Sequence, residues 1–298
     1  MLGQLGLSHE LFGQLLLPIG TLYDPFIRRG LDALFYSVYS GAKFIVVGTP
    51  SGVTLASEGG AHQSLMTPSI GTELPELVSY EPCFAQELEW IMMDSLARIQ
   101  RRETSSYLRL TTKRIDQGIF PNCTDLSQRE QLRVQVLAGA YRLRDSHNQA
   151  GYEPGQNVVY LFACGAMVPE ALAAQSLLRE EGVFVNVINV TGPGPLYASF
   201  QRAAHAAIEG ITSENNLFDE LVPADERSMP IVTLTDAHPH SLAWIGSALG
   251  TRVLPLGVVE FGQSGSLDQI YRKHQIDRDS IVAACLAVLK FATPAHRP

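Results

Sequence analysis

Residues 158–190, VVYLFACGAMVPEALAAQSLLREEGVFVNVINV, decide the fold class. The first six and the last eight residues of this stretch are almost wholly apolar, and each run predicts a buried strand. Between them, residues 170–181 have the apolar spacing of a helix, and Gly182 is of the residue type that commonly ends one. A helix joining two buried strands favours parallel pairing, because parallel strands are covered on both faces.

The same alternation extends along the rest of the chain. Short β-branched runs predict buried strands at residues 43–49 and 231–235, and longer periodic segments predict helices at residues 81–102 and 277–290. Alternation of strands and helices indicates an α/β fold with mostly parallel sheets.

The length of 298 residues allows one large or two ordinary domains. Polar and turn residues cluster between residues 116 and 156, although residues 134–143 keep enough apolar content to predict a strand that enters a second unit. We therefore expect two three-layer α/β units, residues 1–125 and residues 126–298. Residues 2–17 predict a helix with no strand before it, so we expect the first unit to be truncated at its N-terminus.

Composition excludes several classes of protein. Apolar residues make up 46% and charged residues 17%, which argues against disorder, and the net charge of -8 argues against electrostatic nucleic-acid binding. The chain shows neither a signal peptide nor an apolar run long enough for a membrane span, so we expect a cytoplasmic protein. No C-x-x-C motif joins the four cysteines, so neither a zinc site nor a disulfide framework is predicted; they are Cys83, Cys123, Cys164 and Cys285.

Residues 48–71, GTPSGVTLASEGGAHQSLMTPSIG, form the most informative loop. The loop follows a predicted strand, and ligands of open α/β sheets bind beyond the carboxyl ends of strands. Glu58 and His62 lie four residues apart in it, and a histidine beside a carboxylate can transfer protons near neutral pH. A surface histidine in a glycine-rich turn is the structural alternative.

Within this loop, SEGGAHQS resembles the D-G-P-T-H-Q motif of the transketolase superfamily. The longer run VVGTPSGVTLASEGGAHQSLMTPSIG resembles the homodimeric first components of 2-oxo acid dehydrogenase complexes, of the pyruvate dehydrogenase type. The similarity continues through SYEPCFAQELEWIMMDSL and YLRLTT to VEFGQSGSLDQIYRKHQID. The resemblance implies a transketolase-like pyrimidine-binding domain, truncated at its N-terminus, followed by a transketolase C-terminal domain.

The resemblance also implies roles for four residues. His62 matches a histidine that lies beside the thiazolium of thiamine diphosphate and the substrate, where it helps proton transfer. Glu58 matches an acidic position that faces the substrate. Tyr23 and Phe26, in TLYDPF, match aromatic residues that pack against the aminopyrimidine ring; without the resemblance, an aromatic pair in the core is the simpler interpretation.

Two features of the family have no match in this chain. The family binds Mg²⁺ and the diphosphate through a Gly-Asp-Gly motif followed by an asparagine, and this sequence has no Gly-Asp-Gly. The glutamate that activates the cofactor lies, in relatives, just before the segment that matches residues 1–17. We therefore expect the magnesium ligands to come from a missing region or a partner chain, and the isolated chain to be inactive.

The function implied is oxidative decarboxylation of pyruvate, or a related 2-oxo acid, with acyl transfer to the lipoyl group of a dihydrolipoyl acyltransferase. A homodimer is implied as well. One alternative is a subunit of a split transketolase acting on sugar phosphates, although Arg109 in YLRLTTKR lies three residues too early to match the phosphate-binding arginine of transketolases. The other alternative is a non-catalytic module for dimerisation or docking within a complex.

Overall fold

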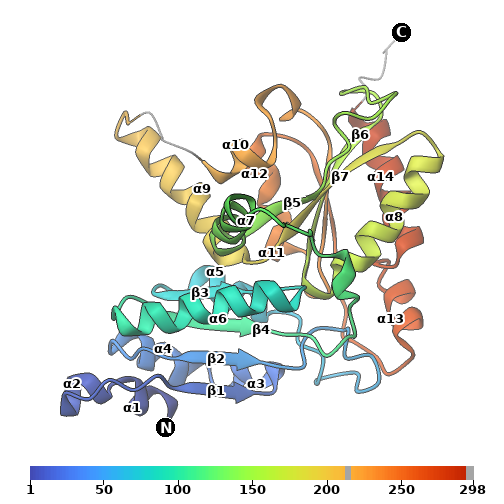
Figure 1. Ribbon diagram of the computed structural model, residues 1–298. Helices are drawn as coiled ribbons and strands as arrows, with labels where there is room; N and C mark the ends of the chain where they lie inside the picture. Colours follow the sequence, from blue (N-terminus) through green and yellow to red (C-terminus); the bar gives the residue numbers. More distant parts are fainter. Residues whose placement is uncertain (212–215, 293–298) are drawn as a thin grey trace.

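Two β-sheets, each covered by helices, make up the protein in the computed structural model, which describes residues 1–211 and 216–292 (Figure 1). The first sheet has the strand order β1-β2-β4-β3, and the second has the order β5-β7-β6-β8-β9. All neighbouring strands are parallel except β5 and β7. These sheets confirm the predicted α/β class.

The strands of the first sheet are β1 (Ile19–Leu22), β2 (Ile45–Gly48), β3 (Leu77–Tyr80) and β4 (Ser105–Arg109), and those of the second are β5 (Ala140–Arg144), β6 (Val158–Cys164), β7 (Phe184–Val190), β8 (Ile231–Leu234) and β9 (Val253–Leu256). The helices are α1 (Leu2–Gly6), α2 (Ser8–Phe12), α3 (Asp24–Arg29), α4 (Leu31–Tyr39), α5 (Thr67–Glu73), α6 (Ala85–Gln100), α7 (Leu126–Ala138), α8 (Val168–Glu180), α9 (Pro193–Ile208), α10 (Leu217–Leu221), α11 (His240–Ala243), α12 (Ile245–Leu249), α13 (Leu267–Lys273) and α14 (Arg278–Ala292). Short 3₁₀ helices cover Gln117–Ile119, Gly165–Met167 and Ala224–Glu226.

The second sheet contains the predicted strand–helix–strand unit. Every residue of β6 and β7 is buried, and α8 joins the two strands. Helices α8 and α14 lie against one face of this sheet, while α9, α10 and α12 lie on the opposite side (Figure 1). Burial on both faces explains why the sequence of these strands is almost wholly apolar.

The first sheet differs from the prediction in two ways. It has four strands rather than one, because β1, β3 and β4 are only four or five residues long and give little periodic signal. In place of the single helix predicted over residues 2–17 there are two short helices, α1 and α2, and the second ends at Phe12, where Gly13 adopts a left-handed conformation with φ 71°. A strand, β1, follows it at the edge of the sheet.

The predicted strand over residues 134–143 is wrong in its first half. Helix α7 continues to Ala138, and its start is capped by the Asp125 carboxylate, which accepts a hydrogen bond from the amide of Ser127 at 2.8 Å. Gly139, with φ 110°, ends the helix and lets the chain turn directly into β5. The domain boundary near residue 125 stays a prediction; β1–β4 precede it and β5–β9 follow it.

A buried carboxylate connects the two sheets. Glu87, in the first turn of α6, accepts hydrogen bonds from the amides of Cys83 and Phe84. It also accepts bonds from the Tyr141 hydroxyl of β5 at 2.8 Å and the Asn189 amide of β7 at 2.7 Å. Burial raises the pKa of Glu87 to about 7, and these donors oppose the rise.

Among the described residues, no helix combines the length and the apolarity needed to cross a bilayer.

Replacing Glu87 by alanine leaves four buried donors without their acceptor. We expect Glu87→Ala to lower the free energy of unfolding by about 2–4 kcal/mol, measured by urea denaturation at pH 7. Glu89→Ala is the matched control, because Glu89 lies on the same helix but is exposed, and it should change stability by less than about 0.5 kcal/mol. Equal effects of the two variants would contradict this role for Glu87.

Candidate functional site

The loop between β2 and α5 carries His62 and lies against the second unit. The Gly60 amide donates to the Gly262 carbonyl at 3.0 Å, and the Val53 amide donates to the Asp236 carbonyl at 3.1 Å. Gly52 has φ 66°, and a Cβ there would lie 2.0 Å from the Asp236 carboxylate, so only glycine fits. The loop is therefore fixed by contacts with residues distant in sequence.

The four predicted site residues lie close together. The rings of Tyr23 and Phe26 meet edge to face with centroids 5.6 Å apart, and the Tyr23 ring lies 5.9 Å from that of His62. The Nδ1 atom of His62 is 3.8 Å from Oε2 of Glu58. Burial, and secondarily the Glu58 charge, raises the pKa of Tyr23. We call these four residues the aromatic–imidazole group.

The aromatic–imidazole group is open to solvent. Phe26 is 42% exposed, and the side chains of His62 and Glu58 are 50% and 51% exposed. The Arg29 guanidinium lies over the Phe26 ring, 4.8 Å from its centroid. The group can therefore offer a flat ligand an aromatic edge and an imidazole for proton transfer, and the interpretation of Tyr23 and Phe26 as a buried core pair is wrong.

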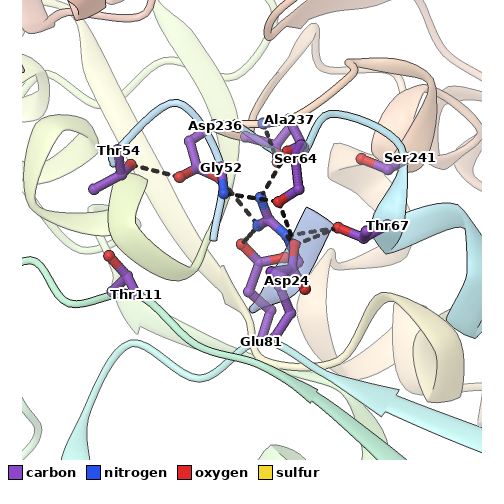
Figure 2. A network of polar contacts seen from close by, with 12 residues as sticks. Asp24, Gly52, Thr54, Ser64, Thr67, Glu81, Thr111, Asp236, Ala237 and Ser241 are labelled. Carbon is purple, nitrogen blue, oxygen red and sulfur yellow. Dashed lines mark hydrogen bonds and ion pairs between the residues drawn. The ribbon is translucent and has the colours of Figure 1, made fainter. Parts of the chain in front are cut away.

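A buried ionic cluster lies beneath this surface, and sequence reasoning missed it. Arg109, at the end of β4, is 2% exposed and is surrounded by the carboxylates of Asp24, Glu81 and Asp236. We call these four residues the arginine cluster. Figure 2 shows the three carboxylates converging with Ser64 and Thr67 on one point.

Each member of the arginine cluster comes from the carboxyl end of a parallel strand. Asp24 and Glu81 follow β1 and β3, and Asp236 follows β8 of the second sheet. The two sheets therefore direct these strand ends toward one another, which is where open α/β sheets bind ligands. The one signal in the sequence is Arg109 itself, a charged residue at the end of a buried strand. The sequence gives no indication of which carboxylates pair with it.

The contacts of Arg109 use all three nitrogens of its guanidinium. Nη1 donates to Glu81 and, at 3.0 Å, to Oδ1 of Asp236. Nε donates to the Thr67 hydroxyl at 3.3 Å, and Nη2 donates to the Ser64 carbonyl at 3.4 Å. Since these donors are taken by internal partners, Arg109 is not free to bind a substrate phosphate.

Asp24 is fully buried and joins α3 to the loop. Its Oδ2 accepts hydrogen bonds from the hydroxyls of Ser64 and, at 2.7 Å, Thr67, and its Oδ1 accepts one from the hydroxyl of Tyr107. Oδ2 also lies 3.5 Å from Nε of Arg109. The Asp24 carboxylate therefore binds to the loop that carries His62, and Tyr23 directly precedes Asp24 in the chain.

Three carboxylates share one buried guanidinium, so the cluster carries excess negative charge. Burial raises the pKa of Glu81 to about 7, the Arg109 charge opposes this rise, and the Asp236 and Asp24 charges add to it. A proton on Glu81 relieves the repulsion among the three carboxylates.

Two hollows lie outside the aromatic–imidazole group. One, of about 620 Å³, is lined by Glu73, Arg98, Tyr197 and other residues between α5 and α9. The other, of about 360 Å³, is lined by Arg28, Met66, Ser69, His238 and neighbours. Tyr23 and His62 line neither of these two hollows. In the part of the chain that the structure describes, no group of three or more His, Cys, Asp or Glu side chains could hold a metal ion.

Comparison with known proteins identifies the second unit. Residues 139–277 match the family described as "Transketolase-like TK C-terminal domain". The chain carries a transketolase-like C-terminal domain. It is 27% identical over 296 residues to the pyruvate dehydrogenase E1 component of Mycobacterium tuberculosis, covering 95% of this chain but 30% of that protein. The chain thus spans about a third of the length of this relative, as the predicted C-terminal portion.

The chain is also similar to a transketolase subunit in sequence and to transketolases in structure. The 6-deoxy-6-sulfo-D-fructose transketolase subunit SqwH of Clostridium sp. is 28% identical over 193 residues, covering 63% of this chain and 52% of that subunit. The transketolase of Pichia stipitis (mutant R525L) superposes with a TM-score of 0.69 at 16% identity, over 93% of this chain and 34% of that one. A split-gene transketolase, solved as an inactive beta4 tetramer, superposes with a TM-score of 0.59 at 15% identity, over 97% and 82%. At 15–16% identity, these structural likenesses show the fold alone.

The raised pKa of Glu81 sets the direction of a pH effect. The pKa is higher in the folded state, about 7, than its ordinary value of 4.5, so the folded protein binds more protons between these values and is more stable at acid pH. The unfolding free energy of wild type minus that of Glu81→Gln should therefore become more positive as pH falls from about 8 to about 5, by up to about 1.4 kcal/mol per unit of pKa difference, because the neutral glutamine resembles the protonated carboxyl and lacks the cost of the buried charge at high pH. Urea denaturation at several pH values measures it. A value of wild type minus Glu81→Gln that stays constant or becomes more negative toward acid pH would contradict the raised pKa.

Proposed function

We propose that this chain is the pyrimidine-side and C-terminal portion of a thiamine-diphosphate-dependent 2-oxo acid dehydrogenase acting on pyruvate. The observation that carries the proposal is the meeting of Tyr23, Phe26 and His62 at one exposed surface, in a chain similar over 95% of its length to a pyruvate dehydrogenase E1 component. The reaction is decarboxylation, followed by acyl transfer to the lipoyl group of a dihydrolipoyl acyltransferase.

The residues present fit one part of the cofactor. Tyr23 and Phe26 offer an aromatic edge on which an aminopyrimidine ring packs, and Phe26 is exposed enough to receive it. When bound, thiamine diphosphate supplies the electron sink that decarboxylation requires. The Mg²⁺ and diphosphate ligands come from a diphosphate-binding region or partner chain, and the working unit is a homodimer.

His62 and Glu58 act on the substrate side. The His62 imidazole is exposed and stands 5.9 Å from the Tyr23 ring, so it can transfer a proton to or from an oxygen of a substrate bound above that ring. Glu58 lies 3.8 Å from the imidazole and is exposed on the same side of the loop. Both side chains are reached from solvent, which suits a site completed by a second surface.

A split transketolase is the second candidate, because of the similarity to the SqwH transketolase subunit. Ketol transfer between sugar phosphates needs a cation for the phosphate. Arg109 is buried and paired with carboxylates, so it does not serve, and this favours the oxo-acid reaction.

The first test reconstitutes activity. The chain is co-expressed with a diphosphate-binding region, and decarboxylation of pyruvate is assayed with thiamine diphosphate and Mg²⁺. We expect His62→Ala to lower the rate by on the order of 10²–10⁴-fold, as for loss of a general acid–base group. His205→Ala, at an exposed position on α9, is the control and should not change it.

Unchanged activity in His62→Ala would refute the role of His62. Ketol transfer without pyruvate decarboxylation would select the transketolase alternative. No activity of either kind with a folded partner present would leave the docking module as the function.

The aromatic contact predicts a difference between two variants of one residue. Phe26→Tyr keeps the ring and should keep the affinity of the reconstituted protein for thiamine diphosphate. Phe26→Leu keeps an apolar side chain but loses the ring, and should weaken the affinity by about two- to tenfold, equivalent to about 0.5–1.5 kcal/mol. Titration by fluorescence quenching measures both, and equal affinities would show that Phe26 does not contact the cofactor.

A further inference from the structure

We propose that Arg109 is a positioning residue, which fixes the Tyr23 ring relative to the His62 imidazole. The arginine touches neither residue and acts through Asp24 and Ser64. The geometric claim concerns the chain by itself, and only its catalytic consequence rests on the proposed function.

The first connection runs from Arg109 through Asp24 to Tyr23. Asp24 is the first residue of α3, and Tyr23 precedes it as the N-cap. Because aspartate has a short side chain, holding its carboxylate holds the adjoining backbone. The carboxylate is 0% exposed and contacts three hydroxyls in addition to the guanidinium, so Tyr23 has little freedom to move.

The second connection runs from Arg109 through Ser64 to His62. The Ser64 carbonyl accepts from Nη2 at 3.4 Å, and Ser64 lies two residues after His62. The Ser64 hydroxyl donates to Asp24 and accepts from the Gly52 amide at 3.0 Å. One guanidinium therefore holds the two segments that bear the Tyr23 and His62 rings.

The charge and the shape of arginine are both needed at this position. A neutral residue would leave Asp24, Glu81 and Asp236 buried without a counter-charge. A lysine would supply the charge but not the planar fork, which here reaches two carboxylates through Nη1 and Ser64 through Nη2. Arg109→Lys therefore keeps the positive charge that balances the carboxylates but loses the planar fork that positions Asp24 and Ser64.

The test reads the geometry directly, in the full chain without cofactor or partner. The probe is the His62 ring-proton NMR signal, assigned with His62→Gln, because a ring 5.9 Å away shifts it by its ring current. We expect Arg109→Lys and Asp24→Asn to move this signal. Thr67→Val, which removes a hydroxyl bound to both Asp24 and Arg109, is the milder variant if those two fail to fold.

The control is Glu226→Gln, since Glu226 is another buried carboxylate whose partners are His147, Tyr152 and Tyr160. It should lower the thermal unfolding midpoint and leave the His62 signal in place. The proposal is overturned if the variants of the arginine cluster lower the midpoint but leave the His62 signal unchanged.

The reconstituted enzyme gives the catalytic consequence. A displacement of about 1 Å at a reacting group can cost on the order of 10²-fold in rate, and we expect Arg109→Lys to lose activity on that scale. If the reconstituted protein does not decarboxylate pyruvate while Arg109→Lys still shifts the His62 signal, the proposed function fails and the positioning role stands.

Discussion

The burial of one guanidinium among three carboxylates is the constraint on which the rest of the structure depends. Arg109 is 2% exposed, and the desolvation of such a group is compensated only when its partners are fixed in good geometry. The partners follow β1, β3 and β8, so both sheets must present their carboxyl ends to the same point. The arrangement of the two sheets and the pairing of the charges therefore determine each other.

The candidate site is an outer layer built on this cluster. The aromatic–imidazole group is exposed and has few internal contacts of its own, so its geometry depends on what lies beneath it. Asp24 and Ser64 belong to the buried layer. Tyr23, one residue before Asp24, is half-buried, and His62, two residues before Ser64, is exposed. This division suits a site that a second surface completes, because the chemistry stays accessible while its support is rigid. Glu87 adds a second buried connection between the sheets.

Sequence reasoning predicted the parts of the fold that are locally encoded. The apolar runs over residues 158–163 and 183–190 gave β6 and β7, and the periodic segment between them gave α8. It failed where elements are short or polar. The first sheet has four strands, and residues 134–138 belong to α7 because a glycine, rather than loss of apolar content, ends that helix. The roles of the four candidate site residues were predicted from resemblance to the transketolase superfamily and stay predictions, although the structure shows that these residues lie close together.

The sequence by itself determined the α/β class and the loop that carries His62, since apolar periodicity and a short motif are properties of neighbouring residues. Only the tertiary structure decided the role of Arg109. Its carboxylate partners Glu81 and Asp236 lie 28 and 127 residues away, and no local pattern links them. An unpaired charge in a protein interior is unfavourable. Here the charge of Arg109 is paired by carboxylates that the fold brings together from the ends of strands far apart in the sequence, so only the tertiary structure reveals the pairing.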